Sequence, residues 1–125
     1  MILRIDRDRT DATFFLAKKP RYKQDPPNIQ LGGIAANLAR VRSFGCDPDN
    51  SKSVIFLLRE SRFFIDWAAP DVSLEIAIEL RDLQRLITRW LITWEHIWTD
   101  ETERETVLQT AKAWSDRLLA RSGLI

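Results

Sequence analysis

From about residue 29 to its end, this 125-residue chain repeats its apolar residues at spacings of three and four. That period places them along one face of an α-helix and differs from the period of two that marks a half-buried strand. Turn-forming residues divide the pattern into four segments, which predict helices at about 29–44, 51–68, 72–98 and 101–122. Since no alternation of strand and helix patterns follows residue 28, the parallel sheet of a nucleotide-binding fold is excluded.

Residues that stop or start helices separate these segments. Gly45 is placed to end the first helix, and Pro70 blocks the continuation of the second. Asp71 can cap the third helix, and either Asp100 or Thr99 can cap the fourth, which Gly123 ends. Four amphipathic helices joined by short turns predict an all-α fold, and the up-down four-helix bundle is its simplest arrangement.

The amino-terminal part of the chain differs in charge and pattern. Residues 1–24 hold seven basic and three acidic side chains, a net charge of +4, whereas the whole chain carries only +1. Two apolar stretches, 2–5 and 12–17, predict a short β-hairpin or an extended arm. The proline-rich stretch 18–27 lacks an apolar period and predicts an extended linker. We therefore expect a basic arm with its linker at 1–28 and a helical bundle at 29–125.

Composition excludes several classes of protein. A hydrophobic fraction of 45% is that of a globular chain, and a net charge of +1 gives no overall field that would recruit nucleic acid or an anionic membrane. One cysteine and one histidine exclude a disulfide scaffold and a Cys/His zinc site. No signal peptide or membrane-spanning run is visible. We expect a soluble, cytoplasmic protein without a metal or a cofactor.

Tryptophan is the most unusual feature, with five in the chain. Trp90, Trp94 and Trp98 follow one another at intervals of four, and the first two lie on the apolar stripe of the third helix. Trp98 is offset toward the side shared with Leu91, with His96 nearby, so we expect it to be exposed. Because tryptophan is a preferred anchor in protein interfaces, we predict an interaction patch formed by Trp98, Leu91 and His96.

Two basic features are candidates for binding. Arg81, Arg85 and Arg89 recur at intervals of four and predict a basic ridge on the outer side of the third helix, able to contact phosphates or an acidic partner. A solvated charged face is the simpler interpretation, because acidic residues lie among them. The basic arm contributes Lys18, Lys19, Arg21 and Lys23, and there we favour a tether over a nucleic-acid site.

The lone histidine removes most acid–base and nucleophile–base pairs, so we expect no enzyme. The first hypothesis is a non-catalytic helical protein that acts by protein–protein contact, as an adaptor, assembly factor or regulatory subunit, with another protein or a second copy of itself as partner. One alternative is a bundle that binds an apolar small molecule or pigment, in a pocket lined by Phe63, Phe64, Trp90 and Trp94. A second alternative is a nucleic-acid contact through the basic arm, which would weaken steeply with salt.

Overall fold

The chain is all-α, as predicted. The computed structural model describes residues 12–123, in which every regular element is an α-helix or a 3-10 turn and no strand is present. The α-helices are α2 (Lys19–Gln24), α3 (Pro27–Phe44), α4 (Ser51–Ala68), α5 (Leu74–Ile92), α6 (Trp94–Thr99) and α7 (Glu101–Ser122). The 3-10 turns are η1 (Pro48–Asn50) and η2 (Ala69–Asp71). The first stretch of the predicted hairpin, residues 2–5, lies outside the described residues.

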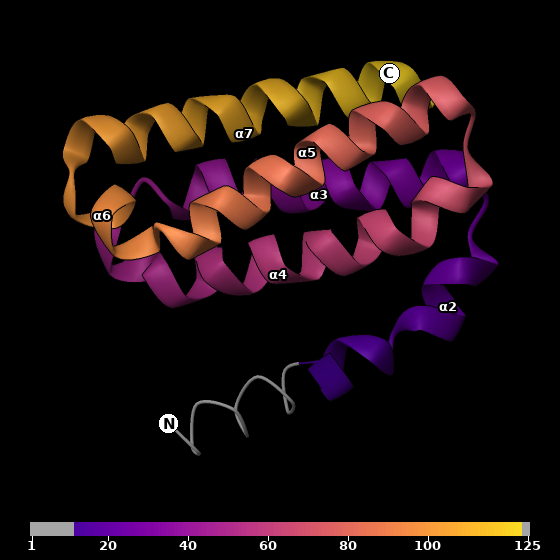
Figure 1. Cartoon of the computed structure of the whole chain (residues 1–125), viewed down its shortest axis with the longest axis horizontal. Helices are drawn as coiled ribbons and strands as arrows, with labels where there is room; N and C mark the ends of the chain where they lie inside the picture. The colour runs from indigo at the N-terminus through magenta and orange to yellow at the C-terminus, as the bar shows by residue number, and fades with distance from the viewer. Residues whose placement is uncertain (1–11, 124–125) are drawn as a thin grey trace.

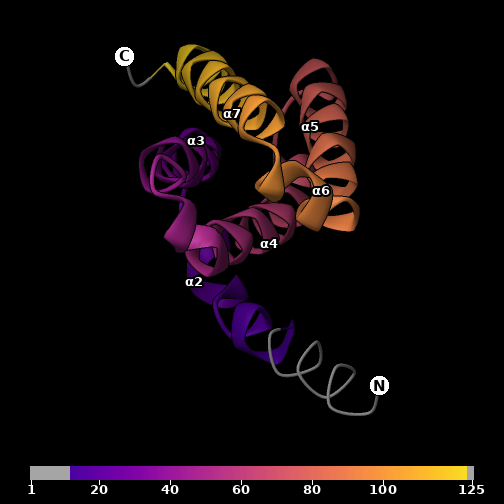
Figure 2. The ribbon, with the colours of Figure 1, turned by 90° about the vertical axis from the view of Figure 1, so that its left-hand side faces the viewer.

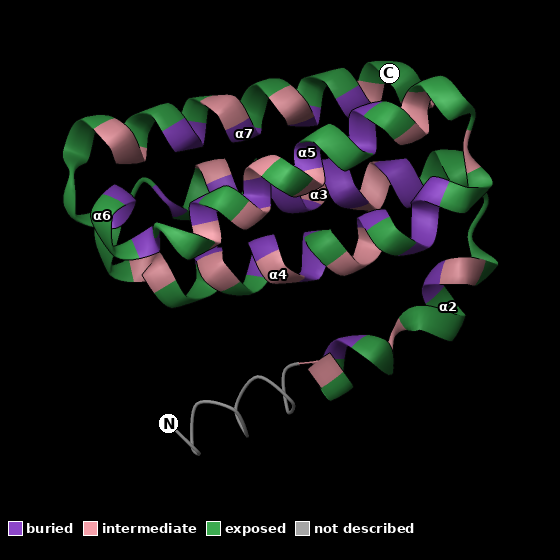
Figure 3. Ribbon diagram, in the orientation of Figure 1, coloured by how far each residue is buried: buried purple, intermediate pink, exposed green. Residues whose placement is uncertain are grey.

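The four long helices run lengthwise side by side (Figure 1). Seen from the end, α7 lies between α3 on one side and α5 on the other, with α4 below them (Figure 2). α3 packs most extensively against α7 and α4, and α4 packs against α5, whereas α5 and α7 touch only sparsely. Buried residues of these helices face the space between them, and exposed residues cover the outside (Figure 3).

The most extensive packing between the described helices joins α3 to α7. The Ser115 hydroxyl donates a hydrogen bond of 2.7 Å to the backbone carbonyl of Ala35, and both residues are buried. At the end of α3, a Cβ atom at Gly45 would lie 2.2 Å from Cδ2 of Leu108. Gly45 does end α3 as predicted, and its lack of a side chain also admits Leu108 to the core.

The predicted extended linker is helical. Residues 12–16 form a helical turn, and α2 follows with a proline in its first turn, where no backbone N–H is needed. Phe15 and Tyr22 are buried against aromatic rings of α4: Phe15 lies 5.2 Å from Phe63, and Tyr22 lies 4.3 Å from Phe64, centroid to centroid. Burial of these rings stabilises a helix that the local sequence pattern does not indicate.

The predicted third helix, 72–98, is two helices. Thr93 leaves helical geometry at φ −104° and ψ 23°, and its hydroxyl donates to the carbonyl of Arg89 at 2.9 Å. Such a bond from a threonine to the preceding turn competes with helix propagation. The amino-terminal cap is Ser73, which accepts from the N–H of Ile76, while Asp71 accepts from Lys23. Of the two predicted caps of α7, the structure has Asp100, which accepts from two backbone N–H groups.

A nearly buried carboxylate ties α5 to α7. Glu79, 8% exposed, accepts hydrogen bonds from Arg117 at 2.7 Å and from Arg121 at 2.8 and 3.1 Å. The hydrogen bonds from Arg121, and then those from Arg117, hold the pKa of Glu79 below its ordinary value of 4.5, against the opposing effect of burial. The carboxylate therefore stabilises the fold above about pH 4.5, and this contribution is lost as the pH falls through the lowered pKa.

Glu79→Gln is expected to lower the free energy of unfolding at pH 7 by about 2 kcal/mol, because two arginines lose a charged acceptor. Urea denaturation at pH 7 and again near pH 3 measures the difference between variant and wild type, which should shrink at the lower pH. Glu75→Gln is the matched control, since Glu75 also bonds Arg121 but is well exposed. It should change stability by less than about 0.5 kcal/mol. An equal effect of the two substitutions would contradict the role assigned to Glu79.

Candidate functional site

Trp94 and Trp98 support the turn between α3 and α4 from its core side. Trp94 and Trp98 stack with their ring centroids 4.8 Å apart and their planes at 18°. Nε1 of Trp94 donates to the hydroxyl of Ser51 at 2.9 Å, and Nε1 of Trp98 donates to the carbonyl of Pro48 at 2.7 Å. Each is only 9% exposed. The prediction of an exposed Trp98 is wrong, because the bend at Thr93 turns α6 toward the α3–α4 turn.

The other two members of the predicted patch do not extend it. Leu91 is half-buried and packs against the core. His96 is exposed, and its Nε2 lies 3.2 Å from a carboxylate oxygen of Glu103 on α7. The structure therefore places a core residue, a half-buried residue and a surface residue where one exposed apolar patch was expected.

The described part of the basic arm, from residue 12 onward, is held against α4 and η2. Lys18 pairs with Glu60 at 2.5 Å, and Glu60, 7% exposed, also accepts from Asn37 at 3.1 Å. Lys23 donates to Asp71 at 2.5 Å and to the carbonyl of Trp67 at 2.8 Å. Lys19 and Arg21 are exposed. Lys18 and Lys23 thus bond carboxylates, and Lys23 also bonds a backbone carbonyl. The segment that was expected to be a tether instead contains α2, which packs against the bundle.

The predicted pocket residues fall into separate aromatic groups. Phe63 and Phe64 contact Trp67 and the rings of the amino-terminal segment, with Phe64 stacked on Tyr22. Trp94 instead stacks on Trp98, and Trp90 is buried in the core. Among residues 12–123, no ring contact joins the phenylalanine pair to the tryptophan pair.

The predicted basic ridge lies on the outside of α5, as expected. Arg81 donates to Asp66 at 2.7 Å and to Gln84 at 2.8 Å, and Arg85 lies 3.5 Å from Asp82. The Asp66 pKa is lowered from its ordinary value: hydrogen bonds from Gln84 and Arg81 outweigh the larger single effect of burial, which opposes them. Arg89 is exposed. Exposed apolar residues share this side of the helix, and sequence reasoning missed them: Leu74, Ile78 and Ile92.

An exposed aromatic surface lies on the outer side of α3 and α4, and we call Phe14, Phe44 and Phe56 the phenylalanine surface. Their exposed fractions are 52%, 44% and 40%, and the rings of Phe14 and Phe56 lie 5.9 Å apart. Phe44 and Phe56 line a hollow of about 400 Å³ together with Lys52, Ser53 and Leu57. The sequence offered one signal for it, since Phe56 is a large apolar residue off the apolar stripe of its helix.

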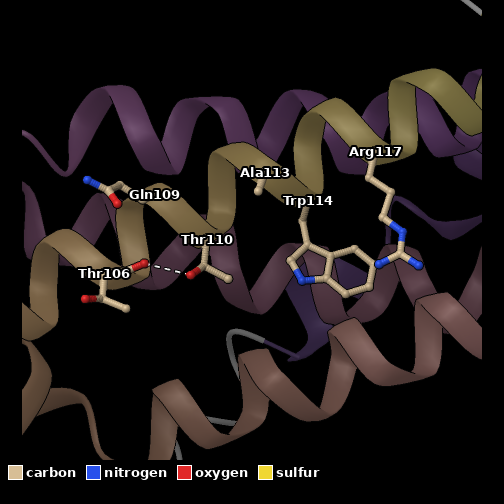
Figure 4. A pocket seen from close by; sticks show the side chains of 6 residues that line it. All are labelled: Thr106, Gln109, Thr110, Ala113, Trp114 and Arg117. Atoms are coloured by element: carbon tan, nitrogen blue, oxygen red, sulfur yellow. Dashed lines mark hydrogen bonds between the residues drawn. The ribbon is translucent and has the colours of Figure 1, made fainter.

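A second hollow, of about 290 Å³, runs along α7 (Figure 4). Six residues of that helix line it: Thr106, Gln109, Thr110, Ala113, Trp114 and Arg117. Its largest side chains are already engaged, since the Arg117 guanidinium lies 4.8 Å from the ring centroid of Trp114 and also bonds Glu79. The Thr110 hydroxyl is directed to the Thr106 carbonyl. The main polar and aromatic groups of this hollow are therefore already occupied by contacts within the chain.

Comparison with known proteins adds no identity to these sites: no family model, no curated protein and no solved structure matches the chain. Within residues 12–123, no group of three or more metal-ligating side chains comes together. Across the same residues, every helix is too short or too polar to cross a membrane.

Proposed function

We propose that this chain is a non-catalytic protein of the cytoplasm that acts by binding another protein, as an adaptor, assembly factor or regulatory subunit. The long helices α3, α4, α5 and α7 form the up-down bundle that carries the binding surface. The exposed thiol of Cys46, the single cysteine of the chain, is in keeping with a reducing compartment.

The observation that carries the proposal is the phenylalanine surface. Isolated exposed apolar residues are ordinary, but two large exposed rings that line one hollow, with a third ring packed against one of them, are typical of a contact surface. The turn that leads from Phe44 to α4 is held from behind by the hydrogen bonds of Trp94 and Trp98. A surface fixed in advance loses less conformational entropy on binding.

The chemistry of the hollow defines its partner. Its walls are the rings of Phe44 and Phe56 and the side chain of Leu57, and a volume of about 400 Å³ admits a large apolar anchor residue. Lys52 and Ser53 on the same hollow offer an ammonium and a hydroxyl. The best match is a protein segment with an apolar anchor flanked by a carboxylate that pairs with Lys52.

The test is a binding measurement with a Phe44→Ser/Phe56→Ser variant. Partners retained stoichiometrically by the wild-type chain from its source cell are identified by mass spectrometry, purified and titrated against each chain. The double variant should bind at least about tenfold more weakly, since two apolar contacts are removed. Ile29→Ser is the matched control, because Ile29 is 42% exposed at the start of α3 and outside the hollow. Equal affinity of the double variant and the control, or no stoichiometric partner, would refute the proposal.

A further inference from the structure

The outer face of α5 carries an uncovered stripe of side chains. Leu74, Ile78 and Ile92 are 78%, 56% and 78% exposed, which is high for large apolar residues. Asp82 and Arg85 lie between them, and the spacings of four, four, three and seven residues keep all five on one side of the helix. We call these five residues the α5 stripe. A shallow hollow of about 300 Å³ includes its amino-terminal half.

The two ends and the middle of the stripe keep their character when it is read from the opposite direction, whereas the counterpart of Ile78 is the exposed Arg89. Apolar residues stand at both ends, Leu74 and Ile92, and the opposite charges of Asp82 and Arg85 flank the middle of the helix. If two copies of α5 lie antiparallel about a two-fold axis at that middle, Asp82 faces Arg85 of the partner subunit. The same operation brings Leu74 beside Ile92 of the partner subunit. A contact related by a two-fold axis requires this kind of self-complementarity.

The charges of this face favour a second copy over an acidic partner. Arg81 is already paired with Asp66 at 2.7 Å. Asp82 and Arg85 are 3.5 Å apart in a pair whose side chains are 58% and 78% exposed, so each can still bond a second group. Two of the three arginines of the basic ridge, Arg81 and Arg85, are therefore paired with carboxylates of the same chain, which lowers the repulsion of the ridge toward a copy of itself.

We propose that the chain forms an antiparallel, two-fold symmetric dimer through the α5 stripe. α5 has 19 residues and is about 28 Å long, so one helix pair buries less than the roughly 800 Å² per partner of a standard interface. The dimer accordingly dissociates on dilution. It leaves the phenylalanine surface on α3 and α4 free, so it is independent of the proposed function.

Sedimentation equilibrium of the purified full chain, at loading concentrations from about 1 to 500 μM, tests the dimer. The wild-type chain should shift from monomer to dimer across this range. Asp82→Arg alone and Arg85→Asp alone should each remain monomeric at the highest concentration, because like charges then meet across the axis. Circular dichroism checks that both variants remain folded, as expected for exposed positions.

Mixing the two variants makes the test specific. In an equimolar mixture, two arginines of one chain face two aspartates of the other, so dimers should return, and the double variant Asp82→Arg/Arg85→Asp should also dimerise. Lys112→Asp, a charge reversal in an exposed pair on α7, should dimerise like the wild type. Any one of three results would overturn the proposal: the wild-type chain is monomeric throughout, the single variants dimerise normally, or the mixture stays monomeric.

Discussion

Trp98→Ala is expected to lower the free energy of unfolding by about 3–4 kcal/mol, as measured by urea denaturation followed at 222 nm. The substitution removes a large buried side chain, its stack on Trp94 and its hydrogen bond to the Pro48 carbonyl. It also removes a ring that lies 5.6 Å from the guanidinium of Arg104. The stack lies within α6, whereas the hydrogen bond joins α6 to η1 and the guanidinium contact joins it to α7, so the loss of Trp98 loosens the α3–α4 turn.

Two further variants separate the parts of this effect. Trp98→Phe keeps an aromatic ring but removes the N–H donor, so we expect a loss of about 1–2 kcal/mol. Trp114→Ala is the control, since Trp114 is half-buried beside the α7 hollow and should have a smaller effect than Trp98. A loss below about 1 kcal/mol for Trp98→Ala would show that Trp98 does not hold this turn.

At alkaline pH, Tyr22 is expected to destabilise the folded chain. Tyr22 is 8% exposed, stacks on Phe64 and donates a hydrogen bond of 2.7 Å to the carbonyl of Gln30. Burial, and secondarily the carboxylate of Asp25, raise the pKa of Tyr22 well above its ordinary value of 10.0. The unfolded chain then loses the phenolic proton at a lower pH than the folded chain, so stability falls as the pH rises above about 10.

The slope is about half of 1.4 kcal/mol per pH unit at pH 10, where half of the unfolded chains have lost the phenolic proton, and it approaches about 1.4 kcal/mol per unit above pH 11, so the loss between pH 10 and pH 12 is about 2 kcal/mol. Tyr22→Phe should lose about 1 kcal/mol at pH 7 through its missing hydrogen bond, and it should lack this part of the alkaline slope. Lysine titration contributes equally to the free energy of unfolding of the wild type and of Tyr22→Phe, so it cancels in the difference between them. Tyr22 is the single tyrosine of the chain, so the tyrosinate absorbance reports it alone. Titration of the folded chain near pH 10 would contradict the buried position of the ring.

The helical period of the sequence predicted α3, α4 and α7 to within about two residues at each end. It succeeded because these helices bury one continuous face, so the spacing of apolar residues and their position in space agree. Asp100 and Gly123 were predicted for the same kind of reason, since a cap and a left-handed residue act through the adjacent backbone.

The helical period gave a wrong prediction at Thr93, where the apolar stripe continues although the backbone leaves helical geometry. Trp90, Trp94 and Ile97 keep the spacing of a helix across Thr93, so the pattern predicts one helix where the structure has two. The direction of α6, and with it the burial of Trp98, depends on contacts with Pro48 and Ser51 some 40 to 50 positions earlier. Local spacing does not contain that information.

The candidate site was missed because helical spacing identifies the residues that belong to the core and does not identify those that stay exposed. Phe44 and Phe56 lie off the apolar stripes, and which large residues stay exposed becomes visible only when neighbouring helices are placed. α2 was missed for a related reason: its burial rests on rings of α4 more than 40 positions later in the chain. The exposed position of the three arginines of the ridge was predicted, because an outer helix face needs no partner to define it.

The pairing of α3 with α7 has a consequence during synthesis of the protein. α3 ends at Phe44, but the face of α7 that covers it extends to Leu118, near the end of the chain. At typical translation rates of 5–20 residues per second, the ribosome needs about 4–15 s to add the intervening residues. During that interval the apolar side of α3 is only partly covered, so the nascent chain presents a binding surface for chaperones until its last helix has left the exit tunnel.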